Sequence, residues 1–298
     1  IADRMSSHVG GGGVNTAVSF QRLGFEVRCV VKLGRDDRGR RVRDTLLAEG
    51  VQNDFIVESA DTQTGASVLI SSHSQNATVL TFRGSNSQLV AGDLPTTQWQ
   101  PDLAYIAGLS DGSADVLPNI IDKYTSLKCF IAINPGIRQL SSRLDGLEQI
   151  FEKASLLSLN ANEAAIIIPK LLQWYPTAKS KKLQTDKSDA RDLIKRGLSG
   201  GGFSMSLVHF FEAVLAMGPK CVVVTDGALG AYAATANSIT YCPALPADVR
   251  GTAGAGDAFT STFAAMTWLG WSPEDALVMA TMNANSVIQH ADTLSGLQ

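Results

Sequence analysis

The feature that most limits how this chain can fold is a regular alternation of short apolar runs with stretches of helical periodicity. The run at 221–225, CVVVT, is continuous and rich in β-branched residues, as expected for a strand covered on both faces. Strands that alternate with helices form a mostly parallel sheet with helices on both faces. The sequence therefore predicts a three-layer α/β/α fold. The predicted strands lie at 27–33, 103–107, 129–133, 156–159 and 221–225, and the predicted helices near 14–23, 38–49, 114–126, 206–217, 254–269 and 273–290.

Two regions break this alternation. Residues 64–84 hold two extended runs, 66–71 and 78–82, joined by a turn-like segment without a helix, which predicts a β-hairpin beside the main sheet. Residues 176–202 contain a lysine-rich run and a run of glycines, which predict a solvated loop or an insertion. A length of 298 residues fits one domain over 1–298.

Composition argues against several classes of function. With 25 basic and 28 acidic residues the net charge is −3, so there is no electrostatic case for binding nucleic acid or an anionic membrane. The cysteines and histidines lack the spacing of metal ligands or a redox pair. No apolar run reaches the ~20 residues of a membrane span. Because the N-terminus does not have the shape of a signal peptide, the expected compartment is the cytoplasm.

The strongest local signal is the segment 251–259, GTAGAGDAF, in which small residues lead directly into an amphipathic helix. Free N–H groups at a helix start attract anions, and glycines let a phosphate approach the backbone. Asp257 would lie in the first turn, where a carboxylate can accept the proton of an attacking hydroxyl. The residues alone also allow a plain glycine-rich turn with Asp257 as a helix-start charge. A GxxxxGK[ST] phosphate loop is absent from this segment, so a P-loop mechanism is not supported.

A second glycine cluster, Gly10 to Gly13, opens the first predicted helix and is followed by Asn15. A dinucleotide-binding fingerprint needs a buried strand before the glycines and an acid about 20 residues later, and this segment has neither. The cluster instead suits close approach to a polyhydroxyl ligand, with the Asn15 amide as both donor and acceptor. The alternative is a flexible turn that contacts no ligand.

Together these segments resemble the ribokinase-like (PfkB) family of carbohydrate and nucleoside kinases. The order and spacing of the matching segments cover about residues 5–297. The first and last segments are similar to the two signatures of the family, except that Gly251 replaces the first Asp of the C-terminal one. The matching segments are Gly12-Gly13-Val14-Asn15-Thr16-Ala17 with Gly24 and Gly34, Arg83-Gly84-Ser85-Asn86, Asn160-Ala161-Asn162-Glu163, Thr225-Asp226-Gly227, and 251–259.

The resemblance implies an ATP-dependent, Mg²⁺-requiring enzyme that phosphorylates a hydroxyl of a sugar or nucleoside. It implies that Asp257 is the catalytic base. The other implied roles are an anion hole at Gly254, Ala255 and Gly256; phosphate and Mg²⁺ organisation by Asn160 and Glu163, with Glu163 acting through water; nucleotide contacts at Thr225, Gly227 and Asn285; and substrate contacts at Gly12, Gly13, Asn15 and Arg83. For Arg83, pairing with a carboxylate is an equal alternative.

The resemblance also implies a lid, formed by residues at about 1–13 and 64–84, that excludes water on closure. In many members of the family such a lid also forms a homodimer interface. Two departures matter. Gly251 leaves activation by a monovalent cation in doubt, and the chain is expected to start after the strand whose Asp binds substrate hydroxyls in relatives. The competing hypothesis is a ligand-binding or regulatory protein that keeps the fold without turnover.

Overall fold

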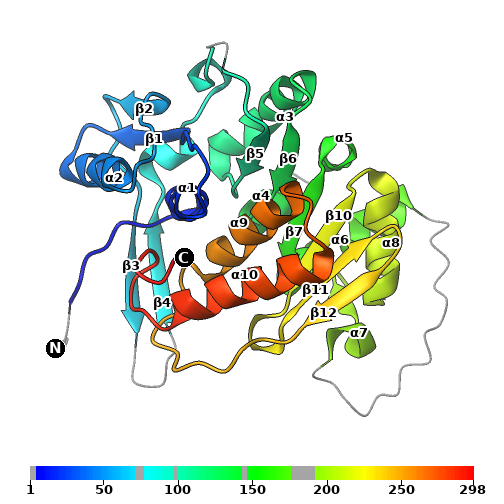
Figure 1. Ribbon diagram of the computed structural model, residues 1–298. Helices are drawn as coiled ribbons and strands as arrows, with labels where there is room; N and C mark the ends of the chain where they lie inside the picture. Colours follow the sequence, from blue (N-terminus) through cyan, green and yellow to red (C-terminus); the bar gives the residue numbers. More distant parts are fainter. Residues whose placement is uncertain (1–4, 72–76, 97–98, 143–145, 176–191) are drawn as a thin grey trace.

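The described residues form a central six-stranded sheet in the order β12-β11-β10-β7-β6-β5 (Figure 1). The computed structural model describes residues 5–71, 77–96, 99–142, 146–175 and 192–298. Strands β5, β6, β7 and β10 run parallel, which confirms the mostly parallel sheet, while β11 and β12 add an antiparallel edge that was not predicted. The strands are Leu103–Ile106 (β5), Phe130–Ile133 (β6), Leu156–Asn160 (β7), Cys221–Thr225 (β10), Ala231–Thr235 (β11) and Ile239–Cys242 (β12).

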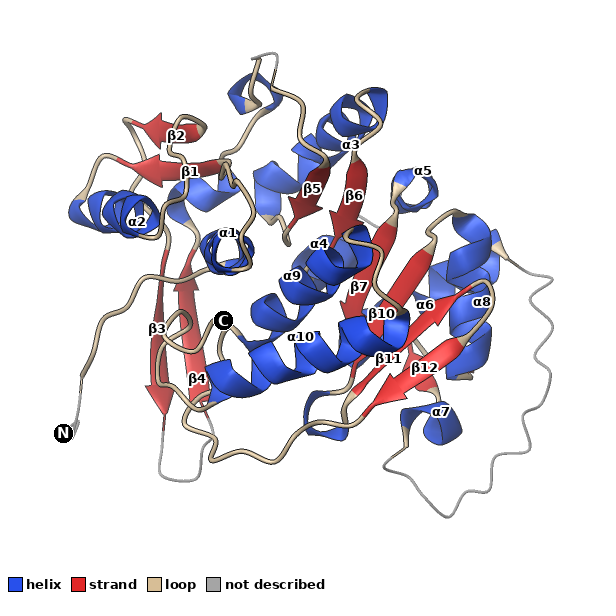
Figure 2. Cartoon of the chain, viewed as in Figure 1, coloured by secondary structure: helices blue, strands red, loops and turns tan. Residues whose placement is uncertain are grey.

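Helices cover both faces of this sheet (Figure 2). Side chains alternate along a strand, so Val222 and Val224 of β10 enter one buried apolar layer while Cys221 and Val223 enter the other. The first layer includes α3 to α6 and α8, and the second includes α1, α9 and α10. The three-layer α/β/α prediction is therefore confirmed. The helices are Gly12–Arg22 (α1), Asp37–Ala48 (α2), Leu117–Ser126 (α3), Ile137–Ser142 (α4), Leu147–Lys153 (α5), Ala161–Trp174 (α6), Leu193–Arg196 (α7), Leu207–Met217 (α8), Ala255–Trp268 (α9) and Pro273–Ile288 (α10).

Residues 27–33 do not form a strand of the main sheet, so that prediction was wrong in extent and partner. Only Val31–Gly34 is a strand (β1), and it pairs in parallel with Ile56–Ser59 (β2) in a separate sheet. Upstream, a single bridge joins Arg28 to Gln52. Branched apolar residues identified an extended segment, but a strand's partner depends on tertiary context that such residues do not encode.

The predicted hairpin is confirmed, with β3 (Ala66–Ser71) antiparallel to β4 (Ala77–Phe82). Alternation places Val68 opposite Leu80 on one face and Leu69 opposite Val79 on the other. These four side chains are 53–59% exposed. Both faces of the hairpin therefore present apolar side chains that the described residues leave uncovered.

Two further predictions need correction. The helix expected at 114–126 begins as a 3₁₀ segment, Asp111–Val116, and becomes α3 only at Leu117. Of the predicted insertion, 176–191 lies outside the described residues, and the part after it is exposed at Lys195, Arg196, Ser199, Gly201 and Gly202 but also contains buried residues. There Leu193 and Leu198 are only 1% and 3% exposed, in α7 and in a short strand, β8 (Leu198–Gly200), paired with β9 (Phe203–Met205).

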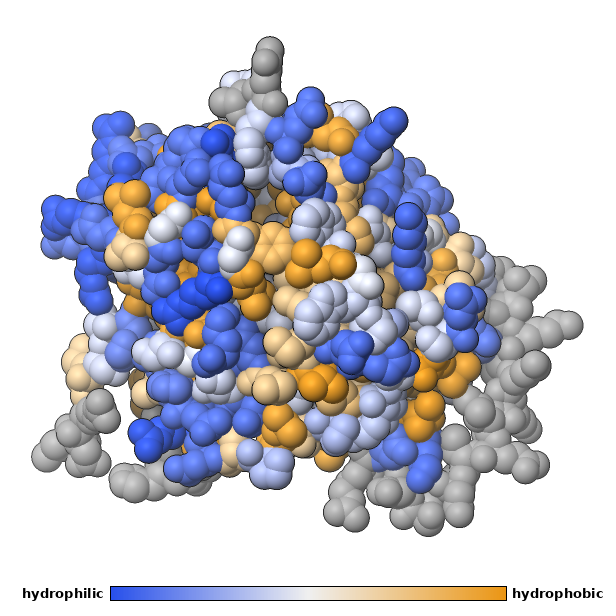
Figure 3. Space-filling view, viewed as in Figure 1, coloured by the Kyte–Doolittle hydropathy of each residue, from blue (hydrophilic) through white to orange (hydrophobic). Residues whose placement is uncertain are grey.

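Helix α2 is mostly solvent-facing, since only Gly39 and Leu46 are buried along it. Hydrophilic side chains accordingly predominate over this part of the surface in Figure 3. Of the predicted lid residues 1–13, those from 5 to 11 have no regular structure and 1–4 lie outside the described residues. In the described part of the chain, no helix combines the length and apolar character that a membrane span requires.

Candidate active site

The start of α9 carries Asp257 in its first turn. Its N-cap residue, Gly254, has a φ of 82°, a left-handed conformation that glycine adopts without strain. No described side chain caps this helix start, and the Ala255 N–H makes only a long backbone contact, 3.4 Å, to the Thr252 carbonyl. An anion at the positive end of the helix can therefore bind the first-turn amides. A Cβ added at Gly256 would meet no described atom within 4 Å. In the predicted anion hole of Gly254, Ala255 and Gly256, the space beside Gly256 is therefore open, whereas Thr293 lies against Gly254.

Asp257 contacts the glycine loop and α1, although these lie at the other end of the sequence. The Asn15 Nδ2 donates a hydrogen bond to the Asp257 Oδ2 at 2.7 Å, and Asn15 is only 2% exposed. A Cβ added at Gly12 would lie 3.4 Å from the Asp257 Oδ1, so Gly12 leaves room beside that oxygen. Burial raises the pKa of Asp257, and the hydrogen bond from Asn15 opposes that rise. Gly13 faces elsewhere, because its added Cβ would lie 3.2 Å from Val31.

A second group of predicted site residues lies at the carboxyl ends of β7 and β10. Asn160 and Thr225 are register partners on these neighbouring parallel strands, where open α/β sheets bind ligands. Asn160 also caps α6, since its Oδ1 accepts from the Glu163 N–H and the Glu163 Oε2 accepts from the Asn160 N–H, each at 2.9 Å. Burial raises the pKa of Glu163 and the Asn160 hydrogen bonds lower it. Gly227 follows with a φ of 57°, a turn that favours glycine.

The two groups share a neighbour, Tyr105 of β5. The Tyr105 hydroxyl lies 2.6 Å from the Oγ1 of Thr260, which follows Asp257 on α9. Burial raises the pKa of Tyr105, and the negative charges of Asp257 and Glu163 raise it further. Both carboxylates are therefore within electrostatic reach of this phenol, and the contact with Thr260 joins β5 to the first turns of α9.

A comparison with protein-family models matches residues 1–298 to the pfkB family carbohydrate kinases. The chain belongs to the PfkB family. Ribokinase of Bacillus subtilis is 23% identical over 278 residues, which cover 93% of this chain and 80% of that protein. A candidate ribokinase II of Escherichia coli, solved with ATP and Mg²⁺, matches with a TM-score of 0.77 and 17% identity over 99% of this chain and 89% of that one. A nucleoside kinase of Burkholderia thailandensis, solved with inosine, matches with a TM-score of 0.75 and 19% identity over 100% of this chain and 86% of that one.

Membership of the PfkB family confirms the resemblance found in the sequence, and the structural neighbours confirm the ribokinase-like fold. The family is one of kinases, and it implies ATP-dependent phosphorylation of a sugar or nucleoside. The dinucleotide-binding alternative does not fit, because described residues 5–11 contain no strand ahead of the glycine loop.

The residues of this PfkB chain fit a hydrated Mg²⁺ ion, the metal that the family implies. Among the described residues, no group of three or more His, Cys, Asp or Glu could hold a metal ion by itself. Mg²⁺ keeps several of its waters and is usually held by one or two carboxylates together with substrate phosphates. A single half-buried carboxylate, Glu163, next to the Asn160 amide is consistent with that mode.

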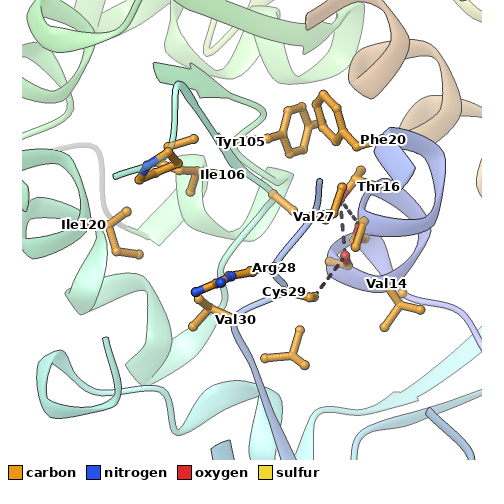
Figure 4. Close-up of a pocket in the computed structure, with 18 of the residues that line it drawn as sticks. Val14, Thr16, Phe20, Val27, Arg28, Cys29, Val30, Tyr105, Ile106 and Ile120 are labelled. Carbon is orange, nitrogen blue, oxygen red and sulfur yellow. Dashed lines mark hydrogen bonds between the residues drawn. The ribbon is translucent and has the colours of Figure 1, made fainter. Parts of the chain in front are cut away.

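A groove of about 740 Å³ lies beside the glycine loop, between residues 27–33 and β5. Figure 4 shows Phe20, Cys29, Tyr105 and Ile120 converging on it from different elements. Among the described residues, β5 is the last strand of the main sheet on this side, and no ladder of hydrogen bonds formed by those residues crosses the groove. Asp257 is not among its lining residues, so the groove adjoins the base rather than enclosing it.

Two predicted ligand residues hold buried polar atoms without a partner in the described part of the chain. These atoms are the Nε of Arg83 and the Oδ1 of Asn285. Buried polar atoms are normally hydrogen-bonded, so both groups suit a ligand that completes them. Arg83 lines the groove directly after the hairpin, whereas Asn285 lies on α10 and has no hydrogen bond to the other predicted site residues within the described chain.

One contact of the site was not predicted as functional. The Oγ1 of Thr293 donates a hydrogen bond to the Oδ1 of Asn15 at 2.8 Å. Thr293 lies 278 positions from Asn15, in a segment without regular structure after α10. A contact at that separation has no local sequence signal, so only the fold could bring it to notice.

Proposed function

We propose that this PfkB protein transfers the γ-phosphoryl group of ATP to a hydroxyl of a sugar or nucleoside, with Asp257 as the general base. The observation that carries the proposal is the position of Asp257 in the first turn of an uncapped helix, where Asn15 holds it at 2.7 Å. Base and anion site then share one helical turn. A hydroxyl that donates to Asp257 lies beside a phosphoryl group bound at the helix start.

In the proposed step, the acceptor oxygen forms a bond to the γ-phosphorus while the bond from that phosphorus to the β,γ-bridging oxygen breaks. ADP leaves, and the hydroxyl proton moves to the carboxylate of Asp257. The amides of Gly254, Ala255 and Gly256 stabilise the charge on the migrating group. Mg²⁺, held through water by Glu163, would neutralise the β- and γ-phosphates.

The positions of the remaining residues divide the ligands between two halves of the site. The carboxyl ends of β7 and β10 suit the nucleotide, and the predicted residues there are Asn160, Thr225 and Gly227. For the adenine ring, the Asn285 Oδ1 is an acceptor without a partner in the described part of the chain. Gly12, Gly13, Asn15 and Arg83 would contact the acceptor. The ATP and inosine bound to the two structural neighbours support ATP as donor and keep nucleosides open beside sugars.

The hairpin is proposed as a lid whose larger apolar face binds a second copy of the chain. Val68, Ile70, Leu80 and Phe82 share that face, and each is 50–59% exposed. An isolated two-stranded hairpin is marginally stable in water, and an open apolar face is costly, so a partner that covers it stabilises the hairpin. The residues that flank the hairpin, Gly65 and Arg83, line the groove. The hairpin is therefore placed where it could cover a bound acceptor.

The proposal is tested by mixing purified protein with ATP, Mg²⁺ and a panel of sugars and nucleosides while ADP formation is monitored. ADP formation that depends on one acceptor supports a kinase and identifies its substrate. Nucleotide binding without ADP formation for any acceptor would favour the alternative, a ligand-binding or regulatory protein that retains the fold.

A further inference from the structure

Three side chains from distant parts of the chain form one line of hydrogen bonds that ends at Asp257, the proposed general base. Thr293 donates to the Asn15 Oδ1 at 2.8 Å, and the Asn15 Nδ2 donates to the Asp257 Oδ2 at 2.7 Å. The Thr293 hydroxyl also lies 3.4 Å from the Val9 carbonyl. A hydroxyl has a single proton to donate, so the shorter contact to Asn15 is the stronger bond.

The hydrogen bond from Thr293 selects the orientation of the Asn15 amide. An asparagine amide has a donor end and an acceptor end, and only the donor end can satisfy the Asp257 carboxylate. If the amide turned over, its oxygen would face a carboxylate oxygen, and neither atom has a proton to share. Because Asn15 is 2% exposed, water has little access to replace a lost partner.

Thr293 is also packed closely on both sides. A Cβ added at Gly10 would lie 2.9 Å from the Thr293 Oγ1, and one added at Gly254 would lie 2.8 Å from the Thr293 Cβ. Thr293 therefore fills the space between the glycine loop and the N-cap of α9. Through these contacts it touches the acceptor side of the site and the start of the anion hole at once.

We infer that Thr293 is a positioning residue for phosphoryl transfer: its hydroxyl orients the Asn15 amide, and the Asn15 amide holds the Asp257 carboxylate toward the acceptor. The inference rests on the proposed function of Asp257 as base. It adds a residue that touches neither ligand in the proposal and whose hydroxyl acts on Asp257 through Asn15. Removal of the hydroxyl therefore lowers turnover without a change in nucleotide affinity.

The pH profile gives a second readout. The hydrogen bond from Asn15 lowers the pKa of Asp257 against the effect of burial. Loss of this bond raises the pKa, and because a general base must be ionised, the pH below which kcat declines moves upward. The titratable groups around this line are the Tyr105 phenol from β5, whose pKa the Asp257 charge raises, and Asp292 with His8 beside Thr293. The pKa of Asp292 lies below its usual range, so Asp292 is already ionised where the decline in kcat is expected.

The test compares Thr293→Val, which keeps the shape and removes the hydroxyl, with Thr293→Ser, which keeps the hydroxyl. We expect Thr293→Val to lower kcat about tenfold, the usual scale for loss of one buried hydrogen-bond partner. The KM of this variant for ATP stays the same, and the pH below which its kcat declines is higher than in the natural protein. Thr293→Ser restores most of the turnover. The matched control is Thr281→Val, a buried threonine on α10 outside the site, with turnover close to that of the natural protein.

A double-mutant cycle separates this inference from the proposed function. If Thr293 acts through Asn15, Thr293→Val has no further effect in an Asn15→Ala background. Equal losses in both backgrounds, or full turnover of Thr293→Val, would overturn the inference while leaving the kinase intact. Absence of turnover in the natural protein would instead overturn the proposed function. Should Thr293→Val not fold, Thr293→Ala removes the same hydroxyl without adding bulk and carries the same expectation.

Discussion

The proposed nucleotide side and the proposed acceptor side of this molecule are built in different ways. On the nucleotide side, Asn160 and Thr225 are paired in a sheet whose strands are buried on both faces, and a reciprocal capping box fixes Glu163. On the acceptor side, the hairpin exposes apolar side chains, residues 27–33 border an open groove, and the Nε of Arg83 has no partner in the described chain.

This difference indicates how a PfkB kinase divides its tasks. Phosphoryl transfer needs a fixed arrangement of charges, and a packed sheet edge supplies it before any ligand binds. Recognition of an acceptor and exclusion of water need groups that the ligand or a closing element completes. Asp257 lies between the two sides, since α9 belongs to the packed core and Asn15 belongs to the glycine-loop helix.

The largest effect is expected where the two sides meet, at the start of α9. Gly254→Ala would place a Cβ 2.8 Å from Thr293 in a residue with a φ of 82°. The helix start must shift, and we expect kcat to fall about 10²–10³-fold, as when an oxyanion donor is lost. Gly270→Ala is the matched control, because Gly270 has the same φ of 82° with nothing within 4 Å. If Gly254→Ala and Gly270→Ala lowered the melting temperature equally and also lowered kcat equally, the loss of turnover would reflect stability alone and would contradict the anion hole.

A change on the nucleotide side should affect Mg²⁺ and leave the acceptor alone. Glu163→Gln retains an oxygen for the capping box but removes the charge, so we expect the apparent affinity for Mg²⁺ in turnover to fall about 10–100-fold. Titration of turnover with Mg²⁺ at saturating ATP measures this, with Glu274→Gln in the first turn of α10 as the control. A raised acceptor KM with an unchanged Mg²⁺ requirement would break the division between the two sides.

A change on the acceptor side should have the reverse effect. Arg83→Ala removes the guanidinium whose Nε is buried without a partner, and we expect the acceptor KM to rise about tenfold, the scale of one lost hydrogen bond to a charged group. The KM for ATP should not change. Initial rates over a grid of both substrates test this, and Arg35→Ala on an exposed side chain is the control. Equal effects on both KM values would show that Arg83 supports the whole site.

The smallest effect on chemistry is expected at the hairpin. Leu80→Glu places a charge on its larger apolar face, so we expect the particle mass measured by light scattering to fall from that of a dimer to that of a monomer. Thr81→Glu, which points to the opposite face, should leave the mass unchanged. A monomer in the natural protein at micromolar concentration would rule out the proposed homodimer.

Local patterns predicted much of this molecule, and long-range contacts account for what they missed. The hairpin at 66–82 and the helix after Gly254 follow from residues adjacent in sequence, and both are present. The contact of Asn15 with Asp257 spans 242 positions, so it could be expected only through the resemblance to a family.

Strand assignment shows the same limit. Strand β11, which lies between β10 and the edge strand β12, has the sequence AYAAT, whose small side chains give little strand signal. Residues 27–33 gave a strong signal, yet the strand is limited to Val31–Gly34, and upstream of it there is only a bridge from Arg28 to Gln52. The contact of Thr293 with Asn15 also depends on the fold, because a threonine in an irregular segment does not reveal a partner 278 positions away.

The central claim is that the Asp257 carboxylate accepts the acceptor's proton. Turnover and nucleotide affinity of Asp257→Asn, measured on the same preparation, test it most directly. The account predicts that phosphoryl transfer falls about 10²–10⁴-fold, the range for a positioned general base, while the Kd for ATP stays within about twofold, because the proposal gives the nucleotide no contact with this carboxylate. Unchanged turnover, or a loss of nucleotide binding in proportion to the loss of turnover, would contradict it.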